Sequence, residues 1–269
     1  MELVYATVML GGMGAVFGLL LAWAAQVFAI EVDERIESIE EILPGANCGA
    51  CGCAGCSNFA EKVAAGECEL TSCIPGGKEV ADQIAEILCL ECQETVPLVA
   101  VVRCAGSHEH AGDKFIYGGA VDCRLAEKMW DGFKNCPYGC LGLGTCVQVC
   151  PFGAITMGED GLPLVDEEKC LGCGLCQDVC PRGIIDMIPR DYSGGLVLCS
   201  STDRGKKVKE ACAVGCIACR ACIKACPEEA ISFVDNLPVI DVEKCTDCGE
   251  CIQVCKPGTI RIRKAKVHQ

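Results

Sequence analysis

The sequence predicts an α+β protein in which one long apolar helix at the N-terminus precedes several small cysteine-rich modules. Three observations predict this fold class. Residues 3–30 carry no charged side chain, cysteine is present 28 times in 269 residues, and a cysteine pattern recurs at long range in the second half. Aromatic residues make up only 5% of the chain, so one large core is not expected. Small modules that bury little surface usually need crosslinks or bound metals.

The uncharged segment 3–30 is long enough to cross a membrane. A helix of this length, at about 1.5 Å per residue, spans roughly 42 Å, whereas the hydrocarbon core of a bilayer is about 30 Å thick. A secretory signal would carry Lys or Arg before the apolar run, where this chain has only Glu2. We therefore expect residues 1–30 to be a transmembrane helix that anchors the chain in lipid. Residues 31–43 are expected to form an amphipathic linker helix, because apolar residues recur there at helical spacing.

The composition excludes some classes of function. A net charge of −14 and a pI of about 4.7 argue against a nucleic-acid partner, which selects clustered Lys and Arg. No nucleotide-binding glycine motif and no catalytic nucleophile stand out. The cysteine content exceeds the roughly 8–10% that calls for disulfides, zinc sites or iron–sulfur clusters. Disulfide scaffolds of this density are usually short secreted domains, so metal sites are favoured.

An internal repeat organises the second half. Four segments share a cysteine, three residues, a second cysteine, an adjacent proline and a strand-like pair: CVQVCPFGAI (146–155), CQDVCPRGII (176–185), CIKACPEEAI (222–231) and CIQVCKPGTI (251–260). Cys136, Cys140, Cys146 and Cys150 recur 76 residues later as Cys212, Cys216, Cys222 and Cys226. Cys170, Cys173, Cys176 and Cys180 recur 75 residues later as Cys245, Cys248, Cys251 and Cys255. We therefore expect a duplicated module, over residues 136–190 and 191–269.

The spacing within each module favours [4Fe–4S] clusters. The run of cysteines at 170, 173, 176 and 180, followed by Pro181, is typical of bacterial two-cluster ferredoxins, in which the fourth cysteine ligates the other cluster. Zinc sites instead favour two separated pairs of cysteines. The expected ligand sets are Cys150 with Cys170, Cys173 and Cys176; Cys226 with Cys245, Cys248 and Cys251; and Cys216 with Cys219, Cys222 and Cys255.

The remaining cluster of the first module departs from the repeat. Leu143 stands where the second module has Cys219. We expect Cys136 to supply the missing thiolate, so that the set is Cys136, Cys140, Cys146 and Cys180. The alternative is a three-iron cluster on the last three of these cysteines.

Another cysteine group lies nearer the N-terminus, in an expected domain over residues 44–80. The segment LPGANCGACGCAGC (43–56) is followed by a predicted helix over 57–67 and by CIPGG (73–77). Its glycines allow a tight backbone wrap around a cluster. The expected ligands are Cys48, Cys51, Cys56 and Cys73.

The ordered combination of an apolar N-terminal helix, an LPGANCGACG domain and two ferredoxin modules resembles the B subunit of the Rnf complex, the membrane-bound ferredoxin:NAD+ oxidoreductase of bacteria. The segments VAVVRC and CPYGCLGLGTC and the second module are similar to the extended form in clostridia and related anaerobes. The resemblance implies that the four cysteines of the 44–80 domain bind a cluster. It also implies a single-pass protein of the cytoplasmic (inner) membrane whose cluster domains face the cytoplasm.

The function implied by the resemblance is that of an electron-transfer subunit of an ion-translocating enzyme complex. Such a subunit takes electrons from soluble ferredoxin and passes them to other Rnf subunits, which couple electron flow to NAD+ to Na+ or H+ movement. The alternative is an iron–sulfur subunit of another membrane-bound oxidoreductase, such as a hydrogenase or formate dehydrogenase. A zinc-binding or regulatory module is a more distant alternative.

The connecting region 81–135 and its surroundings hold further cysteines. Those left over are Cys53, Cys68, Cys89, Cys92, Cys104, Cys123, Cys199 and Cys212. Cys89 and Cys92 could bind a further cluster together with Cys104 and Cys123, or these could be buried free thiols. Cys104 and Cys199 each end an apolar strand and could be equivalent. The sequence thus predicts at least five [4Fe–4S] clusters and leaves a sixth open. His108 and His110 are expected to be solvated.

Overall fold

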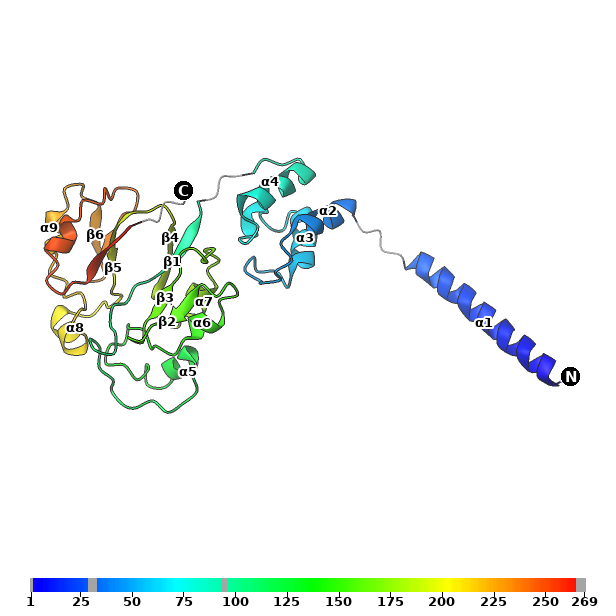
Figure 1. The fold of residues 1–269 in the computed structure, drawn as a ribbon, viewed down its shortest axis with the longest axis horizontal. Helices are drawn as coiled ribbons and strands as arrows, with labels where there is room; N and C mark the ends of the chain where they lie inside the picture. The colour runs from blue at the N-terminus through cyan, green and yellow to red at the C-terminus, as the bar shows by residue number, and fades with distance from the viewer. Residues whose placement is uncertain (1, 29–32, 93–95, 265–269) are drawn as a thin grey trace.

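The computed structural model of the chain describes residues 2–28, 33–92 and 96–264 (Figure 1). The helices of this part are α1 (Glu2–Val27), α2 (Glu34–Ile42), α3 (Cys56–Ala64), the 3-10 helix η1 (Leu70–Ser72), α4 (Gly77–Leu88), α5 (Cys123–Lys128), α6 (Thr145–Gln148), α7 (Leu175–Val179), α8 (Gly205–Ala211), α9 (Ala221–Ala225) and α10 (Glu250–Gln253). The strands are β1 (Leu98–Val102), β2 (Ile155–Met157), β3 (Pro163–Val165), β4 (Ile185–Pro189), β5 (Gly194–Val197), β6 (Ile231–Val234), β7 (Leu237–Ile240) and β8 (Ile260–Arg263). This mixture of helices and two-stranded antiparallel sheets is an α+β architecture.

Helix α1 is the longest helix of the described chain, at 26 residues (Figure 1). It is rich in Leu, Ala and Met, which favour the helical state. Its apolar side chains are exposed, for example Leu10 and Leu19 at 72% each and Trp23 at 62%. Taken over the residues that the structure describes, no helix is both long and apolar enough to cross a membrane. Residues 29 and 30 of the predicted span lie outside the described chain.

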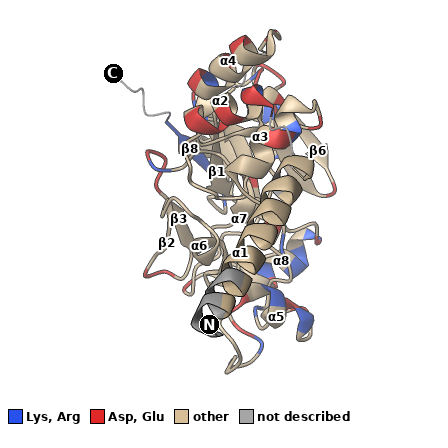
Figure 2. Ribbon diagram, turned by 90° about the vertical axis from the view of Figure 1, so that its right-hand side faces the viewer, with Lys and Arg blue, Asp and Glu red and all other residues tan. Residues whose placement is uncertain are grey.

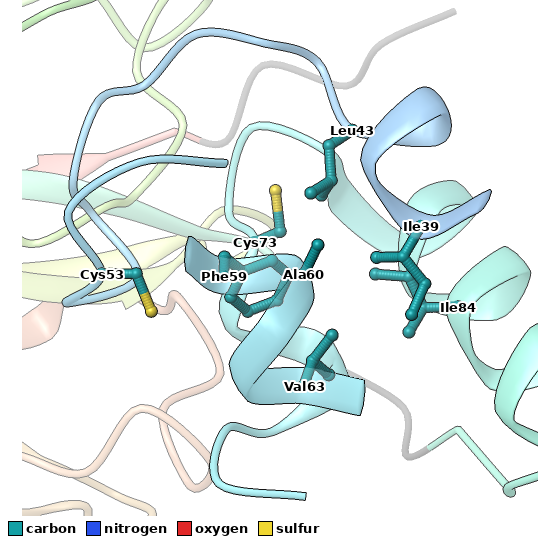
Figure 3. Close-up of a cluster of buried hydrophobic side chains, with 8 residues drawn as sticks. All are labelled: Ile39, Leu43, Cys53, Phe59, Ala60, Val63, Cys73 and Ile84. Carbon is teal, nitrogen blue, oxygen red and sulfur yellow. The ribbon is translucent and has the colours of Figure 1, made fainter. Parts of the chain in front are cut away.

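Helices α2, α3 and α4 form a small helical domain around one apolar core. Figure 3 shows Ile39 of α2 facing Ile84 of α4, beside Phe59 and Val63 of α3. Ile39 and Ile84 are 0% exposed, and Phe59 is 1% exposed. The predicted helix 57–67 is found as α3, which begins one residue earlier, at Cys56.

The predicted linker helix is found as α2, although residues 31 and 32 lie outside the described chain. Asp33 caps this helix, because its carboxylate accepts a hydrogen bond from the backbone N–H of Arg35 at 3.0 Å. Since Ile39 belongs to the core of the helical domain, α2 is a structural part of that domain as well as a connection to α1.

The first ferredoxin-like unit is built on two antiparallel strand pairs. Strand β1 pairs with β4, so that Val102 lies opposite Ile185, and β2 pairs with β3. Val99 of β1 is 0% exposed, and Ile184 and Ile185 are each 2% exposed. Strand β1 comes from the connecting region 81–135, so this unit begins well before residue 136. The four repeated cysteine segments do not reveal this, but the possible equivalence of Cys104 and Cys199 agrees with it, because Cys104 follows β1 and Cys199 follows β5.

The second unit repeats the first. Strand β5 pairs with β8, so that Val197 lies opposite Ile260, and β6 pairs with β7. Helices α9 and α10 of this unit correspond to α6 and α7 of the first. The two units are joined by a buried ion pair, because Arg263 of β8 is 6% exposed and its Nη2 lies 2.9 Å from Glu167 Oε2.

Charged side chains are distributed unevenly along the chain. Acidic residues gather on α2 and α4, whereas Lys and Arg gather on α5 and α8 (Figure 2). The basic residues of α8 are Lys206, Lys207 and Lys209. A local basic surface therefore lies on a protein whose net charge is −14.

Candidate metal centres

The cysteine loops share one local geometry. The residue before each of the helices α6, α7, α9 and α10 has a positive φ, for example Gly144 at 72° before α6 and Gly174 at 81° before α7. Glycine adopts this left-handed conformation without steric cost. The turn bends the loop back on itself, so that successive cysteine side chains point toward one centre. Arg220 takes the same conformation before α9, with φ of 59°.

The helical domain carries a cavity of about 330 Å³ lined by its four predicted cysteines. These are Cys48, Cys51, Cys56 and Cys73. Burial, together with the nearby Cys56, Cys51 and Cys48, raises the pKa of the Cys73 thiol. Asn47 fixes the loop, because its Oδ1 accepts a hydrogen bond from the backbone N–H of Cys56 at 2.8 Å.

The structure places Cys123 in the first ferredoxin-like unit at the position for which the sequence predicts Cys136. A cavity of about 400 Å³ is lined by Cys123, Cys140, Cys146 and Cys180. Burial and the negative charge of nearby Cys123 raise the pKa of Cys146 to about 11. Cys136 does not line this cavity and lies on another, which Cys140 also borders. Cys123, rather than the expected Cys136, thus lies with these three cysteines in the structure, and the sequence does not reveal Cys123 because it belongs to no repeat.

Helix α5 positions Cys123. Cys123 is the first residue of α5, which Asp122 caps by accepting hydrogen bonds from the backbone N–H groups of Arg124 and Leu125. The backbone N–H of Cys123 donates to Thr145 Oγ1 at 2.7 Å, and Thr145 is 2% exposed. The first residue of α6 thus holds the first residue of α5 in place.

The second cysteine set of the first unit is brought together as its spacing predicts. It consists of Cys150, Cys170, Cys173 and Cys176. Burial and then the nearby Cys170 and Cys173 raise the pKa of Cys176 to about 12. Backbone N–H groups point at the sulfurs, from Ala100 to Cys170 Sγ at 3.5 Å and from Ala154 to Cys150 Sγ at 3.4 Å.

The second unit carries two cavities that match the two predicted sets. One of about 370 Å³ is lined by Cys216, Cys219, Cys222 and Cys255. The other, of about 360 Å³, is lined by Cys226, Cys245, Cys248 and Cys251. Burial and neighbouring thiols raise the pKa of Cys216 to about 11 and that of Cys251 to about 11.

These residues fit iron–sulfur clusters. Four thiols surround each cavity, and [4Fe–4S] clusters are held by four cysteine thiolates and tuned by hydrogen bonds to sulfur. Within the described residues, no group of three or more His, Cys, Asp or Glu side chains is arranged to hold a single metal ion.

Several leftover cysteines lie outside these cavities. Cys53 and Cys68 lie side by side, with their Sγ atoms 3.8 Å apart. Burial first, and then Cys68, raise the pKa of Cys53 to about 11.

Cys89 is exposed at the end of α4, and Cys92 interacts with Asp82. Cys104 and Cys123 line different cavities, so the possible further cluster on Cys89, Cys92, Cys104 and Cys123 is not brought together.

The two histidines of the connecting region, His108 and His110, have local partners. His108 is exposed, and its Nδ1 lies 3.4 Å from Lys134 Nζ. His110 Nδ1 lies 2.6 Å from Ser107 Oγ.

Comparisons with known proteins agree with this arrangement. A family model described as "Putative Fe-S cluster" matches residues 43–75, and one described as "4Fe-4S dicluster domain" matches residues 135–184 and 215–259. The B subunit of the ion-translocating oxidoreductase complex of Methanosarcina acetivorans is 44% identical over 97% of this chain and 98% of its own length. The chain belongs to the family of Rnf complex B subunits.

Two further relatives in this Rnf family carry more specific names. The B subunit of the Na+-translocating ferredoxin:NAD+ oxidoreductase complex of Acetobacterium woodii is 44% identical over 93% of this chain and 75% of its own. That of the proton-translocating ferredoxin:NAD+ oxidoreductase complex of Clostridium ljungdahlii is 41% identical over 92% of this chain and 88% of its own. Because the matches cover the helical domain and both ferredoxin-like units, they favour Rnf over the hydrogenase and formate dehydrogenase alternative.

Proposed function

We propose that this chain is the electron-transfer subunit of an ion-translocating ferredoxin:NAD+ oxidoreductase complex. It takes electrons from reduced soluble ferredoxin and delivers them to the other Rnf subunits. The observation that carries the proposal is the set of cysteine-lined sites spread over the helical domain and both ferredoxin-like units. The protein has no substrate chemistry of its own, and the oxidoreductase activity belongs to the complex.

We propose the following ligands for the five sites. The helical domain uses Cys48, Cys51, Cys56 and Cys73; the first unit uses Cys123, Cys140, Cys146 and Cys180 at one site and Cys150, Cys170, Cys173 and Cys176 at the other; the second unit uses Cys216, Cys219, Cys222 and Cys255, and Cys226, Cys245, Cys248 and Cys251. When bound, a [4Fe–4S] cluster supplies a one-electron carrier whose potential depends on burial and on hydrogen bonds to its sulfurs.

The chain's own residues supply both the burial and the hydrogen bonds to sulfur. Cys170 and Cys176 are only 7% and 6% exposed, so water reaches these thiols poorly. The backbone N–H groups of Ala100 and Ala154 donate to cysteine sulfur and stabilise its negative charge. Because Ala100 belongs to β1, the strand from the connecting region also takes part in the site.

Neighbouring sites lie close enough for their cysteines to interact. The negative charge of Cys48 in the helical domain contributes, after burial, to the raised pKa of Cys173 in the first unit. Within the first unit, Cys146 acts on Cys176 in the same way. In the second unit, Cys222 acts on Cys251. Short separations between successive sites are what an electron-transfer chain needs.

We propose that the apolar segment 3–30 anchors the chain in the cytoplasmic membrane as a single pass, with the cluster domains on the cytoplasmic side. The absence of charge from this segment and its length support the proposal. The acidic helix α2 follows directly, which suits a surface in water rather than in lipid.

Reduction by ferredoxin tests the proposed function. The full-length chain, purified anaerobically in detergent with its metal content intact, is mixed with reduced ferredoxin, and the visible absorption of its clusters is followed over time. The absorption should bleach rapidly. A chain that is reduced by dithionite but not by ferredoxin would contradict the proposed donor, and a colourless chain would contradict the clusters themselves.

A further inference from the structure

Four cysteines outside the five sites line one more cavity, between the two ferredoxin-like units. The cavity measures about 430 Å³, and its cysteine lining includes Cys104, Cys136, Cys199 and Cys212. Cys136, Cys199 and Cys212 are each 8% exposed. Two of the four come from the first unit and two from the second, so neither unit builds the cavity alone.

The four cysteines form two equivalent pairs. Cys104 follows β1 and Cys199 follows β5, the strands that occupy the same place in the two units. Cys136 and Cys212 are related by the 76-residue repeat. Each is followed by a tight turn, in which the N–H of Gly139 or Gly215 donates to the cysteine carbonyl at 3.3 and 3.4 Å. The duplication therefore places a matched pair of thiols on each side of the cavity.

Hydrogen bonds to sulfur are duplicated as well. Cys104 Sγ accepts from the backbone N–H of Cys140 at 3.4 Å, and Cys199 Sγ accepts from that of Cys216 at 3.4 Å. Cys140 and Cys216 are proposed ligands of the nearest site in each unit. Cys140 itself lines the cavity, and Cys216 donates to one of the cysteines that line it, so the cavity is linked to a ligand of each of those two sites.

The four thiols are close enough to influence one another. Burial first, and then the nearby Cys199, Cys104 and Cys212, raise the pKa of Cys136. Burial also raises the pKa of Cys212, with further contributions from Cys104 and Cys199.

A buried lysine side chain also lines the cavity. Lys134 lines it, is 3% exposed, and is held by Asp113 through an Nζ–Oδ1 distance of 2.8 Å. Burying an ammonium group is costly unless negative charge lies nearby. Asp113 is 46% exposed at its side chain, and no Asp or Glu lines the cavity, whose polar side chains besides Lys134 are thiols and the hydroxyls of Tyr138, Ser200 and Ser201. A negatively charged group in the cavity would therefore be stabilised by Lys134.

We propose that Cys104, Cys136, Cys199 and Cys212 bind a sixth [4Fe–4S] cluster, which links the sites of the two ferredoxin-like units. The inference rests on the proposed function of the other sites as electron carriers. Each thiol loses its proton to solvent when its sulfur binds iron, so a [4Fe–4S]2+ core with four thiolates carries a net charge of about −2. Without this site, the electron carriers of the first ferredoxin-like unit would be separated from those of the second.

Metal counting on the full-length chain, purified anaerobically in detergent, tests the proposal. With about four irons per cubane, six sites predict about 24 iron and about 24 sulfide per chain. A count near 20 iron would overturn the sixth site, and so would about 20 iron with about one zinc, because a four-cysteine pocket can hold zinc. A chain with almost no iron would instead contradict the proposed function, so the two failures are distinguishable.

Variants identify the ligands. Cys199→Ala and Cys212→Ala should each lower the iron content, either by about four or by about one with the paramagnetic resonance signal of an oxidised three-iron cluster. The matched control is Cys53→Ala, which removes a thiol with 6% exposure from outside all six sites and should keep the full count. Cys199→Ser is the milder replacement if the alanine variants do not fold, and it should alter the resonance spectrum. Wild-type iron content and an unchanged spectrum in all three pocket variants would overturn the assignment.

Discussion

The backbone N–H of Cys140 donates a hydrogen bond to Cys104 Sγ at 3.4 Å, although the two residues are 36 positions apart. The same bond recurs in the second unit between Cys216 and Cys199, also at 3.4 Å. A proposed ligand of one site thus supports a proposed ligand of the next. Because this hydrogen bond links the two sites, a substitution of the cysteine that accepts it is expected to alter both sites.

The first prediction concerns Cys123. Cys123→Ala should leave only Cys140, Cys146 and Cys180 at its site and so produce a three-iron cluster, detected by paramagnetic resonance of the oxidised protein. Leu143 stands where the repeat has Cys219, and it packs in the same small core as Cys123. Adding Leu143→Cys to Cys123→Ala should therefore restore the four-iron form. Leu143→Cys alone is the control and should change nothing; an unaltered spectrum for Cys123→Ala would disprove its role.

The second prediction concerns the buried charge of Lys134. Lys134→Met should lower the reduction potential of the cluster nearest to it, because a buried positive charge favours the reduced, more negative state. The partner Asp113, left without its cation, would act in the same direction. Redox titration followed by paramagnetic resonance measures the shift. Lys209→Met, which changes an exposed side chain of α8, is the control and should have little effect. A potential that stays constant or rises would refute the proposed effect of the charge.

The third prediction concerns the anchor. A chain that begins at residue 31 should be soluble without detergent, and its iron content should equal that of the full chain, since α1 contributes no cysteine. Sedimentation with vesicles that lack the other subunits measures binding. If the shortened chain still sediments with the vesicles, the segment 3–30 is not what holds the protein there.

The fourth prediction concerns the core of the helical domain. Phe59 is 1% exposed and lies among Ile39, Val63 and Ile84 (Figure 3). Phe59→Ala should destabilise this domain by about 3–5 kcal/mol, the usual cost of removing a large buried side chain. Faster release of iron to a chelator should report this loss. Glu61→Ala, on the exposed side of α3, is the control and should release iron at the wild-type rate.

Much of the architecture can be predicted because cysteine spacing is a strong local signal. The sets that contain Cys170 and Cys245 follow from short loops, in which neighbouring cysteines in sequence are neighbours in space. Cys123 cannot be predicted in this way, because its position depends on the hydrogen bond of its N–H to Thr145, a tertiary contact. Strand β1 is indicated only by the possible equivalence of Cys104 and Cys199, and its pairing with β4 is not predicted, since that pairing joins segments far apart in the chain.

The repeat contains more information than its cysteine loops alone reveal. Leu143 indicates that a thiolate is missing from the first unit, and Cys136 is the nearest candidate in sequence. The structure shows instead that Cys136 and its repeat partner Cys212 face one shared cavity. A pair related by duplication can meet across the interface of the two copies, which only the packing of the two units reveals.

Iron-edge anomalous diffraction from anaerobically grown crystals of the full-length chain tests the central claim most directly, because it locates the metal in each cavity. We predict iron density at six positions, each surrounded by one of the proposed sets of four cysteines, including the set of Cys104, Cys136, Cys199 and Cys212. Iron missing from the cavity between the units would contradict the link between them. Zinc-edge density in place of iron throughout would contradict the electron-transfer function as a whole.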